Sequence, residues 1–325
     1  MKALVTGGAG YIGSVVAATL LDEGHSVSVV DDLSSGHRDS VPDGATFHEL
    51  SVGDAAGVSK VLDGASFDVC LHFAGLILAG ESMVTPEPFF TNNVGETFTL
   101  LRELVEHDVG KFVFSSSATV YGEPLYTPID EEHRTQTVNP YGESKLIVEQ
   151  ALGWLSRLGR LRFAALRYFN AAGAVGGRPE RHQPESHLIP LALAAAAGDG
   201  PALQLYGDDY ATPDGTCIRD YIHIGDLATA HVLAIDALDD EDAFICNLGS
   251  ATGSSNAEVI RAVQEITGLE VPVHVAARRP GDVAILVAAN DKARNVLGWS
   301  LGRSTLDQIV TDAWAAYRAG ASARP

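Results

Sequence analysis

VTGGAGYIGS, residues 5–14, is a glycine-rich stretch that lies between an apolar run and an amphipathic one. The run at residues 2–7 predicts a strand, and the pattern over 12–23 predicts a helix. Glycines at this place allow a tight turn and let the backbone approach a pyrophosphate at the helix N-terminus. The glycines that fit the spacing G-x-x-G-x-x-G are Gly7, Gly10 and Gly13. The stretch therefore predicts the first strand–turn–helix unit of a dinucleotide-binding sheet.

An acidic pair ends the second predicted strand, residues 26–32, at Asp31 and Asp32. A carboxylate at this point accepts hydrogen bonds from a ribose 2′-hydroxyl and repels a 2′-phosphate. We therefore expect NAD as the cofactor in preference to NADP.

The first 170 residues alternate apolar runs with amphipathic segments. Near-continuous Val/Ile/Leu strands that alternate with helices indicate an α/β fold, with a doubly wound parallel sheet buried on both faces. The remaining predicted strands are 68–75, 111–122 and 162–170, and the remaining predicted helices are 92–107 and 141–159.

The alternation of apolar runs and amphipathic segments ends near residue 170. Residues 171–187 form a polar loop rich in Gly and Pro, and short helices, loops and Arg-bearing turns follow. We expect a nucleotide-binding domain over 1–170 and a smaller mixed substrate domain over 171–325. Part of 220–255 could return to the first domain.

Composition excludes several classes of partner. Asp and Glu outnumber Lys and Arg by 42 to 22, and the net charge of −20 disfavours nucleic acid and anionic membranes. The longest apolar stretch, 188–198, is too short to span a bilayer, and the N-terminus has no signal-peptide pattern. The three cysteines are scattered, which favours a reducing compartment and argues against structural zinc. We expect a cytoplasmic protein without a metal.

Three polar residues follow the pattern of an acid/base site. Ser117 lies toward the end of a predicted strand, at the sheet edge where ligands of open α/β sheets bind. Tyr141 and Lys145 are spaced i, i+4, on one face of the next long helix. A nearby ammonium and an oxidised nicotinamide would bring the phenol pKa, ordinarily roughly 10, toward neutral. This is the chemistry needed to deprotonate an alcohol while its carbon loses a hydride.

Eight short motifs occur along the chain in a characteristic order, namely GGAGYIGS, HFAG, NNV, SSSATVYG, PYGESK, LRYFN, DGTCIRDYIH and RRPGD. With these motifs the chain resembles the UDP-glucose (UDP-galactose) 4-epimerases of the extended short-chain dehydrogenase/reductase superfamily, from residue 1 to about 317. The resemblance implies a Rossmann-type sheet, an isomerase and a redox-neutral cycle with permanently bound NAD. In that cycle Tyr141 takes the 4-hydroxyl proton, the C4 hydride moves to NAD, and the 4-keto sugar turns over before the hydride returns.

The resemblance also implies which residues form the site. The expected catalytic residues are Ser117, Tyr141 and Lys145, of which Ser117 also contacts substrate and the other two also contact NAD. The other expected cofactor-binding residues are Gly7, Gly10, Tyr11, Ile12, Gly13, Asp31, Asp32, Leu33, Ser34, Ser51, Val52, Phe73, Ala74, Gly75, Asn92, Tyr168 and Phe169. The other expected UDP-sugar-binding residues are Asn170, His187, Leu188, Gln204, Leu205, Tyr206, Arg219, Arg279 and Asp282.

Two departures from the family pattern concern the cofactor. Ser51 replaces the carboxylate expected near adenine, and Ile77 replaces a frequent lysine. Near the sugar, Leu286 occupies a position where family members vary between bulky and small side chains. That position bears on N-acetylated sugars, and leucine leaves the preference open.

Alternative functions share this fold. A 4-epimerase of another UDP-sugar, such as an N-acetylhexosamine or a pentose, is the first. A non-catalytic NAD-sensing protein is the second. A 4,6-dehydratase needs an Asp–Glu pair just after the strand serine, where this chain has Ala118 and Thr119. The family is usually homodimeric, and we expect the helices at 92–107 and 141–159 to form the interface.

Overall fold

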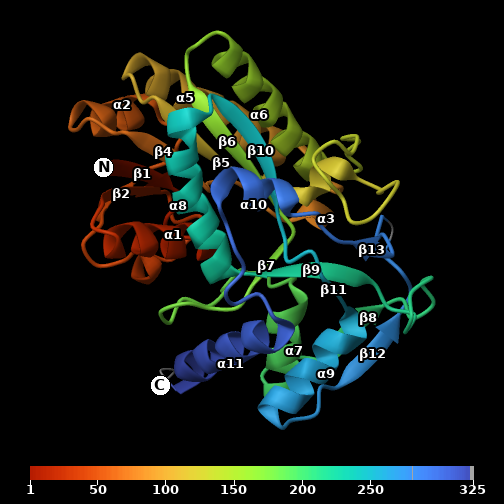
Figure 1. Cartoon of the computed structure of the whole chain (residues 1–325). Coiled ribbons are helices and arrows are strands. Elements are labelled where there is room, and N and C mark those ends of the chain that lie inside the picture. The colour runs from red at the N-terminus through yellow and green to blue at the C-terminus, as the bar shows by residue number, and fades with distance from the viewer. Residues whose placement is uncertain (280, 323–325) are drawn as a thin grey trace.

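The computed structural model describes residues 1–279 and 281–322, and the side chains up to residue 320 (Figure 1). Pro280 of the RRPGD motif and residues 323–325 of the second expected domain lie outside the described residues. The largest element is a seven-stranded sheet in which every pairing is parallel, in the order β10-β6-β5-β4-β1-β2-β3. Its strands are β1 (Lys2–Thr6), β2 (Ser26–Asp31), β3 (Thr46–Glu49), β4 (Val69–His72), β5 (Lys111–Ser117), β6 (Arg162–Tyr168) and β10 (Ala243–Leu248).

Helices cover both faces of this sheet. Successive strand residues point to opposite faces, so that in β1 Ala3 and Val5 join one core cluster and Leu4 joins the other. The first cluster includes residues of α1 (Tyr11–Asp22) and α8 (Ile224–Asp240). The second includes residues of α2 (Ala55–Asp63), α5 (Thr97–Glu106) and α6 (Pro140–Arg157). The predicted doubly wound parallel fold is confirmed.

A smaller mixed unit lies below the carboxyl edge of the sheet in Figure 1. Its central strand β9 (Ile218–His223) pairs with β7 (Asn170–Ala172), β11 (Gly253–Ser255) and β13 (Ile285–Leu286). A separate core cluster joins α7 (Leu188–Ala197), α9 (Asn256–Thr267) and α11 (Leu306–Ser322) to β8 (Leu203–Tyr206). The strand β12 (Val273–Ala276) pairs with β8. The helix α10 (Asp291–Leu297) follows β13.

The chain crosses between the two units more than once. After β9 it returns along α8 and supplies β10, which pairs with β6 at the end of the large sheet. It then leaves again through β11. The expected boundary between residues 170 and 171 stays a prediction.

Three predicted elements are shorter than the sequence pattern indicated by four residues or more. The strand expected at 68–75 ends at His72, and the strand expected at 111–122 ends at Ser117, where the side chain caps a 3₁₀ turn (Ala118–Tyr121). The helix expected at 92–107 begins as a π-helical segment, Thr91–Glu96, after the short α4 (Glu87–Phe90).

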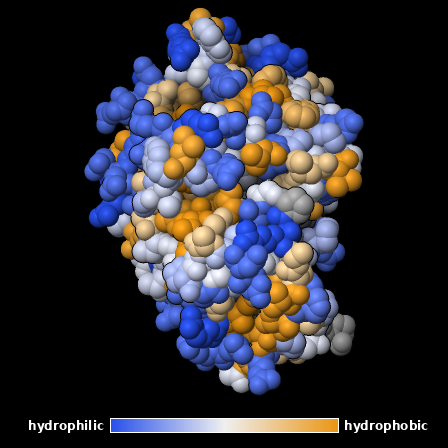
Figure 2. All heavy atoms as spheres, turned by 90° about the vertical axis from the view of Figure 1, so that its right-hand side faces the viewer, coloured by the Kyte–Doolittle hydropathy of each residue, from blue (hydrophilic) through white to orange (hydrophobic). Residues whose placement is uncertain are grey.

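Within the described ranges, the structure has no helix whose length and apolar character would allow it to cross a membrane. Figure 2 shows mainly hydrophilic residues with smaller apolar areas among them on one face of the molecule.

Candidate active site

The glycine turn after β1 packs directly against the chain that leaves β4. Gly7 has φ +70°, and a Cβ there would lie 2.4 Å from the Ala74 nitrogen. A Cβ at Gly13 would lie 2.3 Å from the Gly7 oxygen. Side chains at these positions would force the two turns apart, so the expected residues Gly7, Gly13 and Ala74 do come together. The free N–H groups at the start of α1, together with this close packing, fit a pyrophosphate.

Asp31 is fixed beside this turn. Its carboxylate accepts hydrogen bonds from the Ala9 and Leu33 N–H groups, each at 2.9 Å, and its exposure is 8%. Burial raises the Asp31 pKa, while those N–H groups act in the opposite direction. Asp32 instead accepts from the N–H and hydroxyl of Ser34. Of the two acids, Asp31 is the one held against the glycine turn.

The departure at Ser51 has a structural counterpart that sequence reasoning missed. Ser51 Oγ donates to Glu96 Oε2 at 2.6 Å and accepts the Gly53 N–H at 2.9 Å. Glu96 comes from the π-helical segment before α5, far from Ser51 in sequence. A carboxylate is therefore present at this edge, although it comes from another element. The expected residue Val52 is buried in the core, with 6% exposure.

Tyr141 and Lys145 lie in the first two turns of α6. Asn139 caps this helix by accepting the Gly142 N–H at 2.7 Å, and Pro140 is its first residue. Lys145 Nζ donates to the Ser115 carbonyl of β5 at 2.9 Å and lies 5.9 Å from the Tyr141 ring centroid. The helix start and the strand end thus bring the expected acid/base residues together.

Burial changes the charge balance of this pair. The Lys145 side chain is nearly inaccessible, and desolvation lowers its pKa to about 8, while the Glu149 carboxylate acts in the opposite direction. Burial raises the Tyr141 pKa, and the Ser117 hydroxyl acts against that rise. At pH 7 Lys145 is still mostly protonated, so a positive charge lies close to the phenol.

Ser117 is held in place by the turn that follows β5. Its Oγ accepts the Thr119 hydroxyl at 2.9 Å and the Thr119 N–H at 3.2 Å. Its own proton therefore remains free to be donated. Ala118, which is buried, and Thr119 provide no carboxyl group after the strand.

Asn93, not the expected Asn92, makes the structural contacts in the NNV motif. It is buried and donates to the Leu76 carbonyl at 2.9 Å and to Ser144 Oγ at 3.1 Å, while its own Oδ1 accepts the Leu76 N–H. Asn93 thus ties the loop after β4 to α6. Asn92 is half-buried beside it, and its expected contact with NAD stays a prediction.

A buried ion pair joins α6 to the sheet. Arg167 of β6 and Glu149 of α6 are joined by two hydrogen bonds, 2.9 and 2.6 Å long. Ser116 Oγ also donates to Glu149, and Arg167 donates to the Tyr121 hydroxyl. None of the sequence motifs predicted this pair, because Arg167 and Glu149 come from different elements and meet only where β6 packs against α6.

Four of the expected UDP-sugar residues gather in the smaller unit. Arg279 Nε donates to Asp282 Oδ2 at 2.9 Å, and its guanidinium lies 4.8 Å from the Tyr206 ring centroid. Arg219 Nη2 lies 3.6 Å from Asp282 Oδ1. Arg219 also donates to the Val283 carbonyl, which fixes its position on β9. Two cations, one carboxylate and one aromatic face therefore form a single cluster.

The other expected substrate residues are less closely grouped. Asn170 donates to the Asp220 carbonyl of β9, and Gln204 bonds His274 on β12. Leu188 begins α7, directly after His187. Leu205 is buried in the core of the smaller unit, so its side chain cannot face a ligand there.

Among the expected cofactor residues, Tyr168 is part of the sheet core. Its hydroxyl forms a hydrogen bond with the buried His231, and burial raises its pKa. Phe169 packs beside the small cluster formed by the turn after β5. Tyr11 donates its hydroxyl proton to the Gly173 carbonyl at 2.6 Å. Contacts of these residues with NAD stay predictions.

The Asp of the RDYIH motif has a structural role. Asp220 is fully buried and accepts hydrogen bonds from Ser250, Ala251 and Ala288, which hold three chain segments together. Desolvation raises its pKa to about 6, and those hydrogen bonds oppose the rise.

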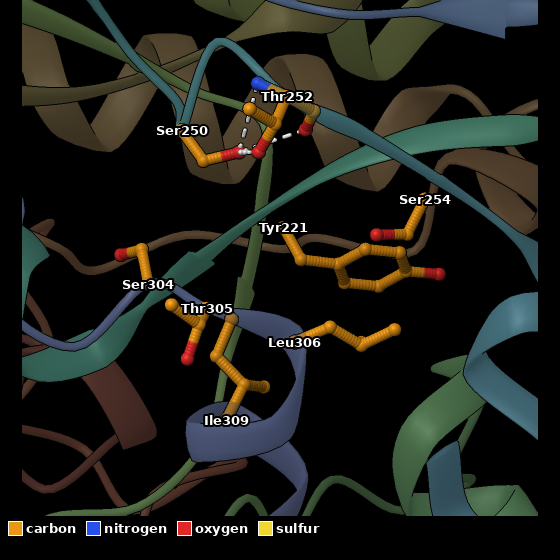
Figure 3. A pocket seen from close by; sticks show the side chains of 8 residues that line it. All are labelled: Tyr221, Ser250, Thr252, Ser254, Ser304, Thr305, Leu306 and Ile309. Carbon is orange, nitrogen blue, oxygen red and sulfur yellow. Dashed lines mark hydrogen bonds between the residues drawn. The ribbon is translucent and has the colours of Figure 1, made fainter.

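A pocket of about 270 Å³ lies between β9, β11 and the start of α11 (Figure 3). It shares no residue with the expected site. Hydroxyl-bearing and aliphatic side chains line it, namely Tyr221, Ser250, Thr252, Ser254, Ser304, Thr305, Leu306 and Ile309.

Comparison with known proteins identifies the family of this chain. Residues 3–249 match the NAD dependent epimerase/dehydratase family. A UDP-glucose 4-epimerase of Streptomyces lividans is 48% identical over 314 residues, or 96% of this chain and 95% of the relative. One of Halalkalibacterium halodurans is 45% identical over 317 residues, or 97% and 95%.

Solved structures give the same result. The UDP-glucose 4-epimerase from Brucella ovis in complex with NAD has a TM-score of 0.94 at 42% identity, covering 97% of this chain and 98% of its own. That from Bifidobacterium longum in complex with NAD⁺ and UDP has a TM-score of 0.94 at 37% identity, with full coverage of both chains.

The chain belongs to the NAD dependent epimerase/dehydratase family. Within that family, the similarity to UDP-glucose 4-epimerases expected from the sequence is confirmed.

Proposed function

We propose that this chain is an NAD-dependent isomerase that epimerises C4 of a UDP-hexose, interconverting UDP-glucose and UDP-galactose through a transient 4-keto intermediate. One observation carries the proposal most directly. Tyr141 and Lys145 share one face of α6, and Lys145 is anchored to β5, the strand that ends at Ser117. The glycine turn and Asp31 at the neighbouring strand ends fit NAD, the expected cofactor.

In this proposal the residues of the chain transfer the proton of the sugar hydroxyl. When bound, NAD would supply first the acceptor and then the donor of the C4 hydride. Tyr141 Oη takes the proton from the sugar 4-hydroxyl, and Ser117 can donate a hydrogen bond to the reacting oxygen because its Oγ already accepts from Thr119 and its own proton is free. Lys145 contributes a positive charge that stabilises the phenolate, and Asn93 keeps the loop after β4 in register with α6.

The smaller unit would hold the UDP. Arg219 and Arg279 can clamp the diphosphate, since guanidinium groups bind such oxygens bidentately, and they are local cations in a chain of net charge −20. Asp282 can accept ribose hydroxyls, and Tyr206 offers a face for uracil. Firm binding at the nucleotide would leave the hexose free to present either face to the cofactor.

A second candidate is a 4-epimerase of another UDP-sugar. Leu286 is half-buried and packs against the cluster formed by the turn after Ser117, so its size bears on the sugar pocket. A UDP-Glc/GlcNAc 4-epimerase from Campylobacter jejuni is 36% identical with a TM-score of 0.86. The UDP-glucose-4-epimerase from Stenotrophomonas maltophila, 38% identical, was solved with formylated UDP-arabinopyranose.

Incubating the purified chain with UDP-galactose, without added NAD, tests the proposal. Formation of UDP-glucose supports a 4-epimerase that retains its cofactor. A parallel panel of UDP-N-acetylhexosamines and UDP-pentoses identifies the preferred sugar. No conversion of any of these, with NAD bound, would instead favour the NAD-sensing alternative.

We further propose a cytoplasmic homodimer formed through α5 and α6. Phe98 on α5, Trp154 on α6 and Leu158 just after it are 42%, 63% and 69% exposed, an unusual apolar content for two solvated helices. The three cysteines are all buried and unpaired, in keeping with a reducing compartment. Light scattering on the wild type and on Trp154→Glu tests the interface, with a dimer and a monomer expected respectively.

A further inference from the structure

Four potential metal ligands meet in the loop between β7 and α7. Glu180, His182, Glu185 and His187 each offer one ligand atom, and these atoms all lie within 4.8 Å of one another. Glu180 Oε1 is 2.9 Å from His182 Nδ1 and 2.8 Å from His187 Nδ1. Glu185 Oε1 is also 2.8 Å from His187 Nδ1.

The cluster is more than a group of solvated acids. The Glu180 side chain is only 6% exposed, and its carboxylate faces two imidazole rings. Glu185 Oε1 accepts the N–H groups of Ser186 and His187 at 2.7 and 2.8 Å, which fix the orientation of the carboxylate. Ligands oriented by further hydrogen bonds are characteristic of metal sites.

The loop is attached on both sides of the glycine turn. Tyr11 of the turn donates to the Gly173 carbonyl at 2.6 Å. Arg181, inside the cluster's span, makes a bidentate pair with Asp39 and donates to Ser40 Oγ, both in the segment after β2. The four ligands therefore lie in a segment whose backbone is already held against the large sheet.

Two imidazole nitrogens and two carboxylate oxygens suit Zn²⁺, which binds such atoms tetrahedrally at about 2.0–2.2 Å. These bond lengths place ligand atoms roughly 3.3 Å apart, so the 2.8–2.9 Å pairs need to open by a few tenths of an ångström, and pairs as far apart as 4.8 Å need to close by about 1.5 Å. Four protein ligands fill a tetrahedral shell and leave no open position for substrate. The arrangement is therefore that of a structural metal site.

We propose that Glu180, His182, Glu185 and His187 bind one divalent transition-metal ion of the zinc class, which locks loop 173–187 against the glycine turn. The sequence predicted no metal because the three cysteines lack the spacing of a zinc site. The proposal takes His187 as a metal ligand, whereas the family resemblance expected it to contact the UDP-sugar, and the test of metal binding needs no catalytic activity.

The experiment uses the full chain, stripped with a chelator and then titrated with Zn²⁺ in a calorimeter. We expect one ion bound per chain and a rise of a few degrees in Tm at saturating Zn²⁺. His182→Ala and the isosteric Glu180→Gln are expected to weaken binding by roughly tenfold or more. His25→Ala, which removes a histidine outside the cluster, is the matched control and is expected to bind like the wild type.

A second readout on the wild type covers variants that fail to fold. Co²⁺ in a tetrahedral site of two nitrogens and two oxygens gives an intense visible absorption, which Zn²⁺ should displace. Failure of the wild type to bind one Zn²⁺ per chain would overturn the proposal and leave a hydrogen-bonded histidine–carboxylate cluster. Equal affinity in His182→Ala and His25→Ala would overturn it as well.

Discussion

The Lys145 ammonium lies 5.9 Å from the centre of the Tyr141 ring, and its Nζ is fixed by a 2.9 Å hydrogen bond to the Ser115 carbonyl. The positive charge is therefore held beside the phenol before any substrate arrives. Because both residues are on α6 and the anchor is on β5, the arrangement depends on how helix and sheet pack.

Replacing Tyr141 by Phe removes the proposed base without changing the ring. Loss of a positioned acid/base group costs about 10²–10⁴-fold in rate, so kcat should fall by that factor. Circular dichroism and bound NAD should be unchanged. Tyr126→Phe, which removes an exposed hydroxyl bonded to Asp130, is the control and should keep full activity. An active Tyr141→Phe enzyme would remove the assignment of the base.

The depressed pKa of Lys145 predicts how stability depends on pH. Burial lowers this pKa to about 8 in the folded chain, from an unfolded value of roughly 10.4. Between these values the unfolded chain binds more protons, so the contribution of Lys145 to stability rises with pH from about 8 upward.

Denaturant unfolding of nucleotide-free protein at pH 7 and pH 9.5 measures this effect. The wild type should gain about 2 kcal/mol relative to Lys145→Met, since 1.5 pH units above the folded pKa correspond to that energy. Parallel pH curves for the two proteins would show that Lys145 titrates normally.

Asp31 should control the grip on NAD. Asp31→Asn keeps the shape but removes the charge that accepts ribose hydroxyls, and hydrogen bonds to charged groups contribute about 1.5–3 kcal/mol. The dissociation constant for NAD should rise by about 10–100-fold, measured by calorimetry on stripped protein. Asp32→Asn, which changes the neighbouring acid bonded to Ser34, should have a much smaller effect. The reverse order would make Asp32 the ribose ligand.

The buried pair Glu149–Arg167 should matter for stability more than its lack of a motif indicates. Arg167→Ala leaves the Glu149 carboxylate buried without its partner, which costs about 3–5 kcal/mol. Arg102→Ala removes an arginine that is 57% exposed and paired with Glu103, and should change unfolding far less. Similar midpoints for the two variants in denaturant unfolding would contradict this account.

The parts of the fold and site that local patterns control could be predicted from the sequence. The glycine spacing and apolar strands predicted the parallel sheet, and the i, i+4 spacing placed Tyr141 and Lys145 together on one helix face. The position of Asp31 could be predicted for the same reason, because it ends the strand that pairs with β1 and therefore lies beside the glycine turn.

What the sequence did not reveal depends on contacts between distant segments. Glu96 reaches Ser51 only because the π-helical segment before α5 lies beside the loop after β3, and Arg167 meets Glu149 only across the sheet–helix interface. Asn93 was missed because the two asparagines of NNV differ only in helical phase, and the π-helical turn alters that phase. Leu205 was expected in the site together with its neighbours Gln204 and Tyr206. The sequence does not show which face of β8 is buried, and the Leu205 side chain lies on the buried face.

The proposed mechanism depends on the ionisation of Tyr141, which ultraviolet difference spectroscopy of phenolate formation measures. Spectra of wild type minus Tyr141→Phe, both loaded with NAD, isolate the absorption of this one tyrosine across a pH titration. The account predicts a phenolate that forms near neutral pH, because the Lys145 charge and the oxidised nicotinamide overcome the effect of burial. A difference spectrum that titrates only near or above the ordinary tyrosine pKa, with NAD bound, would contradict it.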